Sequence, residues 1–164
     1  MGFILLSSET RGKPTAPRHL AERLISRSYA GSWDEARGEW ELVAAWAARG
    51  GCCLCGSRIT QRALLHNTLT GRRVVVGCCC VRHFPNAADL FRALARVMSN
   101  PERPLNPAAV EWAYGRGYLN PWERRFSLDA RDQRLSQRQR WKRLEVHGAL
   151  LVRMAAAGEE GSRA

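Results

Sequence analysis

The sequence predicts a mainly α-helical protein with one small β-hairpin at its centre. Apolar side chains recur at helical spacing on both sides of the centre, and several of these segments open with residues that favour helix starts. Between them, ITQRALLH and RRVVVG have the composition of strands and flank NTLTG, whose Gly71 suits a hairpin turn. Two groups of cysteines, in GCCLCG and GCCC, bracket this hairpin. The 164 residues suffice for one domain or two small lobes.

The segment before the hairpin is predicted to contain an arm and then two helices. Residues 1–17 are predicted to be a flexible arm, because their second half is polar and contains glycine and proline. Residues 18–50 are predicted to be helical, and the second helix begins at Ser32, where Glu35 completes a capping box. The apolar stripe of that helix consists of Trp33, Trp40, Val43 and Ala47. This stripe is predicted to belong to the core.

The segment after the hairpin is predicted to be a helical region over residues 86–157, followed by a disordered tail over residues 158–164. Each helix in it is expected to start at an N-cap residue, and proline at the first helical position strengthens two of these starts. The predicted starts are Asn86, Asn106 before Pro107, Asn120 before Pro121, and Ser136 with Gln139.

The central module, residues 51–85, contains all six cysteines. Cys52 and Cys55, followed by glycine, have the C-x-x-C-G spacing of a zinc knuckle, in which the glycine lets backbone amides face the thiolates. Cys80 and His83 follow the second strand and share one face of a helical turn, as a tetrahedral metal requires. These four residues are the predicted metal ligands. Two alternatives to this ligand set remain. In the first, one of the spare cysteines, Cys53, Cys78 or Cys79, replaces a predicted ligand. In the second, the cysteines form a buried cluster without a metal ion.

Knuckle, hairpin, and then ligands on a helical turn is the order of a treble-clef zinc finger, and residues 50–85 resemble that family. The patterns C-x-x-C-G, N-x-x-T-G and V-G-x-x-C-V are similar to those of small zinc proteins of phages and other mobile elements. Residues 119–140, which include NPWERRF, are similar to a helical motif of the same proteins. The full prediction is therefore a mainly α fold with a small central zinc-bound β-hairpin, a treble-clef-like module flanked by helices.

The predicted Zn²⁺, one per chain, is expected to be structural. Four protein ligands leave no open position for a catalytic water. A module of this size buries too little apolar surface to fold alone, so a metal ion must stabilise it. Zinc binding contributes roughly 10–16 kcal/mol in small fingers, and loss of the metal should therefore unfold the module.

The charge of the chain predicts polyanionic partners. The formal net charge is +11 and the pI is about 10.4, and a protein this positive usually faces nucleic acid. No acidic residue lies between Glu41 and Asp89. A zinc site with three thiolates has a net charge of −1, which one or two arginines would balance. The predicted nucleic-acid-binding residues are Arg58, Arg62, Arg72, Arg73 and Arg82 in the module, with Arg138 and Lys142 on the last helix.

Three functional hypotheses follow. The leading one is a non-catalytic zinc protein of phage or mobile-element origin that binds DNA or RNA. The second is a small subunit of a larger nucleoprotein complex, such as a CRISPR effector complex, whose protein subunits would be further partners. The third is a treble-clef nuclease, for which His66 and Asn67 near the turn are the sole support. Because the module has no acid to hold a second metal, no enzymatic activity is expected.

The sequence also predicts a cytoplasmic location without a membrane partner. No apolar run approaches the roughly 18–20 residues of a membrane span. The first residues lack the basic segment and cleavage site of a signal peptide. In a reducing cytosol, clustered cysteines favour metal binding over disulfides.

Overall fold

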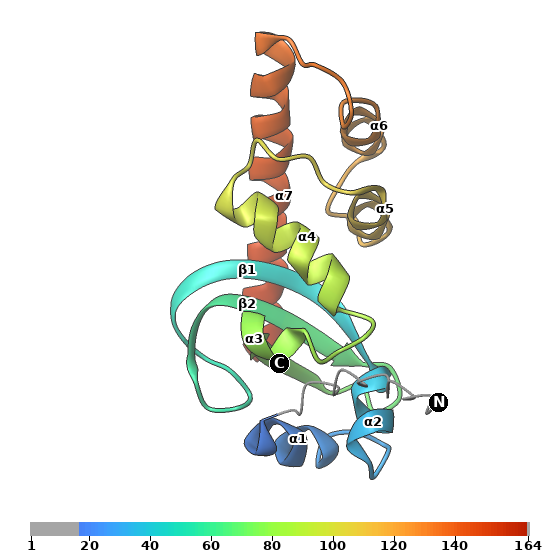
Figure 1. The fold of residues 1–164 in the computed structure, drawn as a ribbon, viewed down its shortest axis with the longest axis vertical. Helices are drawn as coiled ribbons and strands as arrows, with labels where there is room; N and C mark the ends of the chain where they lie inside the picture. Colours follow the sequence, from blue (N-terminus) through green and yellow to red (C-terminus); the bar gives the residue numbers. More distant parts are fainter. Residues whose placement is uncertain (1–16, 164) are drawn as a thin grey trace, which may run out of the picture.

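The structure, a computed structural model, describes residues 17–163 of the chain. Within that range, seven α-helices and a three-stranded antiparallel sheet form a mixed α/β fold (Figure 1). Of the predicted arm, only Pro17 lies in the described range. In chain order the elements are α1 (Arg18–Ile25), α2 (Trp33–Ala36), a 3-10 turn (Arg37–Glu39), β1 (Trp40–Cys52), β2 (Arg58–Asn67), β3 (Arg73–Gly77), α3 (Cys78–Val81), α4 (Ala88–Ser99), α5 (Pro107–Gly115), α6 (Pro121–Asp129) and α7 (Gln137–Arg163).

The predicted hairpin is confirmed as β2 and β3, which pair in an antiparallel register from His66 opposite Arg73 to Arg62 opposite Gly77. Gly71 lies in the connecting turn with φ +71°, a conformation that glycine adopts without the steric cost of a Cβ. Its amide donates to the carbonyl of Asn67 at 2.9 Å. Local turn chemistry thus positions this part of the sheet.

The prediction of a helix from residue 32 to residue 50 is wrong. Helix α2 ends at Ala36, and the chain then forms β1, which adds a third strand beside β2. Trp40, Ala45 and Trp46 are all at most 2% exposed, because both faces of this strand are covered. Two register irregularities along β1 also interrupt the alternation of side chains. A strand buried on both faces lacks the period of two, so its apolar residues matched the helical spacing instead.

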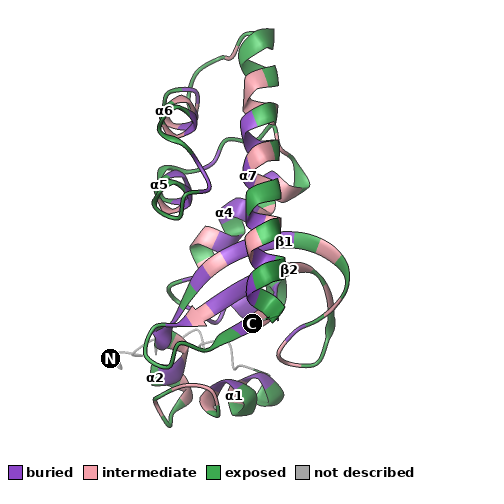
Figure 2. Cartoon of the chain, turned by 180° about the vertical axis from the view of Figure 1, so that it is seen from behind, coloured by how far each residue is buried: buried purple, intermediate pink, exposed green. Residues whose placement is uncertain are grey.

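Helix α7 covers one face of the sheet (Figure 2). Its last turns approach the strands closely, because a methyl group at Gly158 would collide with the Trp46 ring and one at Gly161 would lie 2.5 Å from Leu64 Cδ2. The prediction of a disordered tail is therefore wrong for residues 158–163, which continue the helix against the sheet. Residue 164 lies outside the described range.

The opposite face of the sheet packs against α1 and α4 in the main core. From α1, Leu20 and Leu24 are fully buried, and from α4, Phe91 and Leu94 are at most 3% exposed. This packing fixes the rotation of α1 about its axis.

The helices after the hairpin begin largely as predicted. Asn106 accepts a hydrogen bond from the amide of Ala109 at 2.8 Å, and Asn120 forms a full capping box with Glu123. Ser136 and Gln139 form the expected reciprocal pair at the start of α7. Helix α4 differs, because its N-cap is Ala87, while Asn86 donates to the carbonyl of Gly38 at 2.8 Å.

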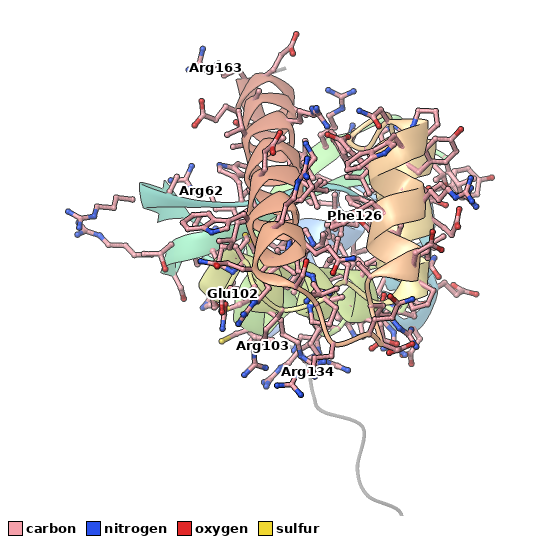
Figure 3. All side chains as sticks on the ribbon, turned by 90° about the horizontal axis from the view of Figure 1, so that it is seen from above. Arg62, Glu102, Arg103, Phe126, Arg134 and Arg163 are labelled. Atoms are coloured by element: carbon pink, nitrogen blue, oxygen red, sulfur yellow. The ribbon has the colours of Figure 1, made fainter. Side chains whose placement is uncertain are left out.

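Helices α5 and α6 lie beside the first half of α7 (Figure 1). Phe126 points from α6 toward α7 (Figure 3). Arg153 on α7 donates to a carboxylate oxygen of Glu123 at 2.8 Å and to the carbonyl of Tyr118 at 2.8 Å. This ion pair and the capping box share Glu123, so the start of α6 is tied to the long helix.

Glu39 is a buried carboxylate at the entrance to β1, with 8% of its surface exposed. Its oxygens accept hydrogen bonds from the amides of Tyr29 and Ala30 at 2.8 and 2.6 Å and from the side-chain amide of Asn67 at 2.6 Å. Burial raises the pKa of Glu39, but these hydrogen bonds together outweigh it and hold the pKa below its usual value. The carboxylate therefore ties the loop after α1 to the hairpin turn.

Replacing this carboxylate should destabilise the fold. We expect Glu39→Ala to lower the free energy of unfolding by about 1–3 kcal/mol, because three buried donors lose their acceptor. The stabilisation should be complete above about pH 4.3 and be lost as the pH falls through the lower pKa of the folded state. Urea unfolding from pH 3 to pH 7 measures both effects.

Glu41→Ala is the matched control, since its carboxylate is 53% exposed and lies 3.8 Å from Arg116. An exposed pair of this kind contributes roughly 0–1 kcal/mol. Equal destabilisation by the two variants would contradict the structural role of Glu39.

Candidate metal centre

Three cysteines of the central module come together. The Sγ atoms of Cys53, Cys55 and Cys80 all lie within 4.8 Å of one another. Cys53 and Cys80 are each 4% exposed, and Cys55 is half-buried. Sulfurs bound to a tetrahedral zinc at about 2.3 Å are roughly 3.8 Å apart, so the cluster needs only small side-chain shifts to hold such an ion. Three close thiols of this kind could hold a metal ion.

The knuckle between β1 and β2 positions two of these thiols. Cys53 donates its amide to the carbonyl of Ser57 at 2.8 Å and accepts from the amide of Gly56 at 2.8 Å. Gly56 has φ +97°, a conformation that favours glycine. Leu54 donates to the carbonyl of Val75 at 2.9 Å. The knuckle is therefore folded over the end of β3.

The third thiol reaches the cluster because α3 begins directly after β3. The amide of Gly77 donates to Cys53 Sγ at 3.2 Å, at the junction of the two elements. A Cβ at Gly77 would lie 2.5 Å from Ile59 Cγ2, so this close approach needs a glycine. From the turn that follows, Cys80 packs against the knuckle thiols.

The cluster favours a thiolate on Cys53. The hydrogen bond from the Cys80 thiol, with further bonds from the amides of Cys55 and Gly77, lowers the pKa of Cys53 to about 5, although burial opposes the shift. The same hydrogen bond and burial raise the pKa of Cys80 above its usual value. The hydrogen-bonded pair of Cys53 and Cys80 thus favours a negative charge on Cys53, and binding of an ion to the cluster would release thiol protons.

The ligand set favoured from the spacing is not the set that comes together. Cys55 and Cys80 belong to the cluster, but the third thiol is that of Cys53, one of the replacements that the sequence left open. Cys52, at the end of β1, is exposed. Cys53 follows the last residue of β1, and the knuckle in which its amide donates to the carbonyl of Ser57 buries its thiol beside those of Cys55 and Cys80.

His83 is not a member of the thiol cluster. Its ring is 4% exposed and packs edge-on against Trp33, with the centroids 6.2 Å apart. Burial, with the nearby charges of Arg82 and Arg37, lowers its pKa. The turn after α3 is retained, since the amide of His83 donates to the carbonyl of Cys80 at 3.1 Å, but the imidazole packs on Trp33 and not with the thiols.

A group of arginines lies beside the knuckle. A hollow of about 600 Å³ between the hairpin turn, the segment after α1 and the end of α7 is lined by Arg27, Arg72 and Arg73. An adjoining hollow of about 390 Å³ is lined by Arg23, Arg27 and Arg73, together with Cys52. We call Arg23, Arg27, Arg72 and Arg73 the arginine surface. None of these four side chains forms an ion pair with an acid among residues 17–163.

Backbone carbonyls hold three of these guanidinium groups in place. Arg23 donates to the carbonyl of Leu54 in the knuckle at 2.8 Å, and Arg72 donates to the carbonyl of Ser26 at 3.0 Å. Arg27 donates to the carbonyl of Arg23 at 2.8 Å. Carbonyls orient the groups without neutralising their charge. Arg23 and Arg27 were not among the predicted residues, because nothing in a short polar segment of sequence indicates which strand turn it will face.

The other predicted nucleic-acid residues are dispersed. Arg62 lies over the Trp46 ring and donates to the carbonyl of Arg49 at 2.9 Å, so it stabilises the irregular part of β1. Lys142 pairs with Glu145 at 2.9 Å and lies 5.0 Å from the centre of the Trp122 ring. The remaining three are exposed at separate places, namely Arg58 at the start of β2, Arg82 after α3 and Arg138 in the first turn of α7.

Comparisons of this chain with protein-family models, curated proteins and solved structures found no match. Among the described residues, every helix is too short or too polar to cross a membrane.

The thiol cluster predicts which cysteines are required for metal binding. We expect the wild-type chain to retain one zinc per molecule, and Cys53→Ser and Cys80→Ser to lose it, because each variant removes one of the three clustered sulfurs. Cys52→Ser should retain it, since that thiol is exposed. Native mass spectrometry after purification without added metal measures the zinc content. Zinc retained by Cys53→Ser and lost by Cys52→Ser would contradict this assignment.

Proposed function

We propose that this chain is a non-catalytic protein that binds nucleic acid through its arginine surface, next to a structural zinc centre on Cys53, Cys55 and Cys80. The strongest support is the arginine surface itself, in which four guanidinium groups line two adjoining hollows without an acidic partner among the described residues. A concentration of uncompensated positive charge is favourable only opposite an anion, and phosphate is the anion that a planar guanidinium binds with two parallel hydrogen bonds.

The geometry suits a phosphate backbone rather than a single small anion. The two hollows share Arg27 and Arg73, so the positive surface is continuous from the hairpin turn to the knuckle. Phosphate contacts of this kind orient a nucleic acid without reading its bases. Tyr29, which is 82% exposed, lies near the hairpin turn and offers an aromatic face on which a base could stack.

The metal centre and the arginine surface are linked through the knuckle. Leu54, whose carbonyl holds Arg23, lies between two of the clustered cysteines. An ion that fixes Cys53 and Cys55 would also fix this carbonyl. The order of knuckle, hairpin and helical turn supports the treble-clef likeness of the module, in which zinc has a structural role.

A second candidate function, as a subunit of a nucleoprotein complex, is supported by the opposite end of the molecule. Trp122 and Trp141 near the start of α6 and α7 are 52% and 66% exposed. Large exposed aromatic side chains are typical of surfaces that contact other proteins. In that case a protein partner would cover this end, and the arginine surface would contact the nucleic acid of the complex.

The salt dependence of binding tests the proposal. With about four phosphate contacts on duplex DNA, the slope of log K against log salt should be roughly −3 to −4. Replacement of Arg72 and Arg73 together by alanine should make the slope shallower by about 2, because each arginine releases about one counterion. Fluorescence anisotropy with labelled duplex DNA, single-stranded DNA and RNA from 20 to roughly 300 mM salt measures the slopes.

The matched control is the double replacement of Arg138 and Lys142 by alanine, which removes the same charge at the other end of α7. This variant should keep the wild-type slope within about 0.5. The proposal fails if the zinc-loaded protein binds none of the three nucleic acids at low salt. It also fails if the control pair, rather than Arg72 and Arg73, changes the slope.

A further inference from the structure

A third hollow, of about 500 Å³, lies on the other side of the clustered thiols. Cys53, Cys55 and Cys80 line it, and so does His19 from the first turn of α1. His19 is exposed, and like His83 it is not a member of the group of ligand atoms that lie within 4.8 Å of one another, so its side chain would have to rotate toward the sulfurs to bind the same ion. An imidazole therefore lines the same hollow as three metal-binding sulfurs, although it comes from a different part of the chain.

The packing of α1 holds His19 toward this hollow. Leu20 and Leu24 are fully buried, so the helix cannot turn about its axis. Arg23 follows His19 by four residues and so lies on the same face of the helix. Its guanidinium donates to the carbonyl of Leu54 at 2.8 Å, within the knuckle. The face of α1 that carries His19 is thus anchored against the segment that carries Cys53 and Cys55.

We propose that His19 is the fourth ligand of the metal centre and completes a closed tetrahedral site with three thiolates. This inference rests on the metal centre of the proposed function. Imidazole is a common fourth ligand of structural zinc beside three cysteines. A neutral imidazole also leaves the site with a net charge of −1, whereas a fourth thiolate would raise it to −2.

The other cysteines of this hollow fit the fourth position less well. Cys78 and Cys79 also line it, but both are exposed and both belong to the same helical turn as Cys80. Successive residues of a helix point about 100° apart, so residues one or two positions apart do not face a common point. His19 approaches from a separate helix and is free of this constraint.

Ligation by His19 would have a consequence for the arginine surface. Helix α1 also carries Arg23, and Arg27 follows in the turn after the helix, where its guanidinium donates to the carbonyl of Arg23 at 2.8 Å. An ion bound by both α1 and the knuckle would hold two of the four arginines in a fixed position relative to β3. The metal would then order the surface that contacts phosphate, and its removal would release α1.

Cobalt substitution in the full 164-residue chain tests the ligand. Co²⁺ bound by thiolates gives a sulfur-to-metal absorption band, and its visible bands shift between three sulfurs with one nitrogen and four sulfurs. We expect the wild type to show the first pattern and His19→Cys to show the second. His19→Ala should weaken Co²⁺ binding by at least about 10-fold and change the visible bands, because water takes the fourth position.

Two matched controls separate His19 from the alternatives. His83→Phe keeps the ring that packs on Trp33 and removes both nitrogens, and Cys79→Ser removes the neighbouring thiol. Both should retain the wild-type spectrum and affinity. If either changes the visible bands while His19→Ala does not, His19 is not the ligand. If the wild type shows no sulfur-to-metal band, the metal centre itself is refuted, which is a separate outcome.

Discussion

The sheet of this protein is covered on both faces, and the positions of the other elements depend on this constraint. Helix α7 packs so closely on one face that Gly158 and Gly161 leave no room for a side chain. Helices α1 and α4 bury their leucines against the other face. With both faces occupied, the knuckle after β1 folds over the end of β3, where the amide of Gly77 meets Cys53 Sγ. The thiol cluster is thus a consequence of how the sheet is packed.

Helix α1 connects the two candidate binding features. On the face that contacts the knuckle, His19 lines the same hollow as the thiols and Arg23 donates to the Leu54 carbonyl, while the turn after the helix contributes Arg27 to the arginine surface. In the proposed function, the metal ion therefore orders the phosphate-binding surface through this helix. A metal ion that only holds structure needs no open coordination position and no catalytic residue. The proposed contact with phosphate agrees with the absence of acidic partners for the four arginines within the described residues.

Short sequence patterns correctly predicted those elements that are stabilised by interactions between residues close together in the chain. The caps at Asn106 and Asn120 and the turn at Gly71 involve residues at most a few positions apart, and all three are confirmed. Strand β1 was mistaken for a helix because its burial on both faces removes the alternation that identifies a strand. The last turn of α7 was missed because Gly158 and Gly161 are poor helix formers, and only their contact with the sheet explains them.

The sequence by itself determined that two groups of cysteines flank a hairpin and that the module has a strong excess of arginine. Which thiols meet was decided by the tertiary structure, because the knuckle folds over β3 and brings Cys53 Sγ to the amide of Gly77, directly before α3. Cys53 is buried there, whereas Cys52, the last residue of β1, is exposed. The placement of His19 and Arg23 beside the knuckle was likewise a tertiary outcome. It depends on the burial of Leu20 and Leu24 against residues far away in the chain, and no pattern of residue spacing in the sequence predicts that contact.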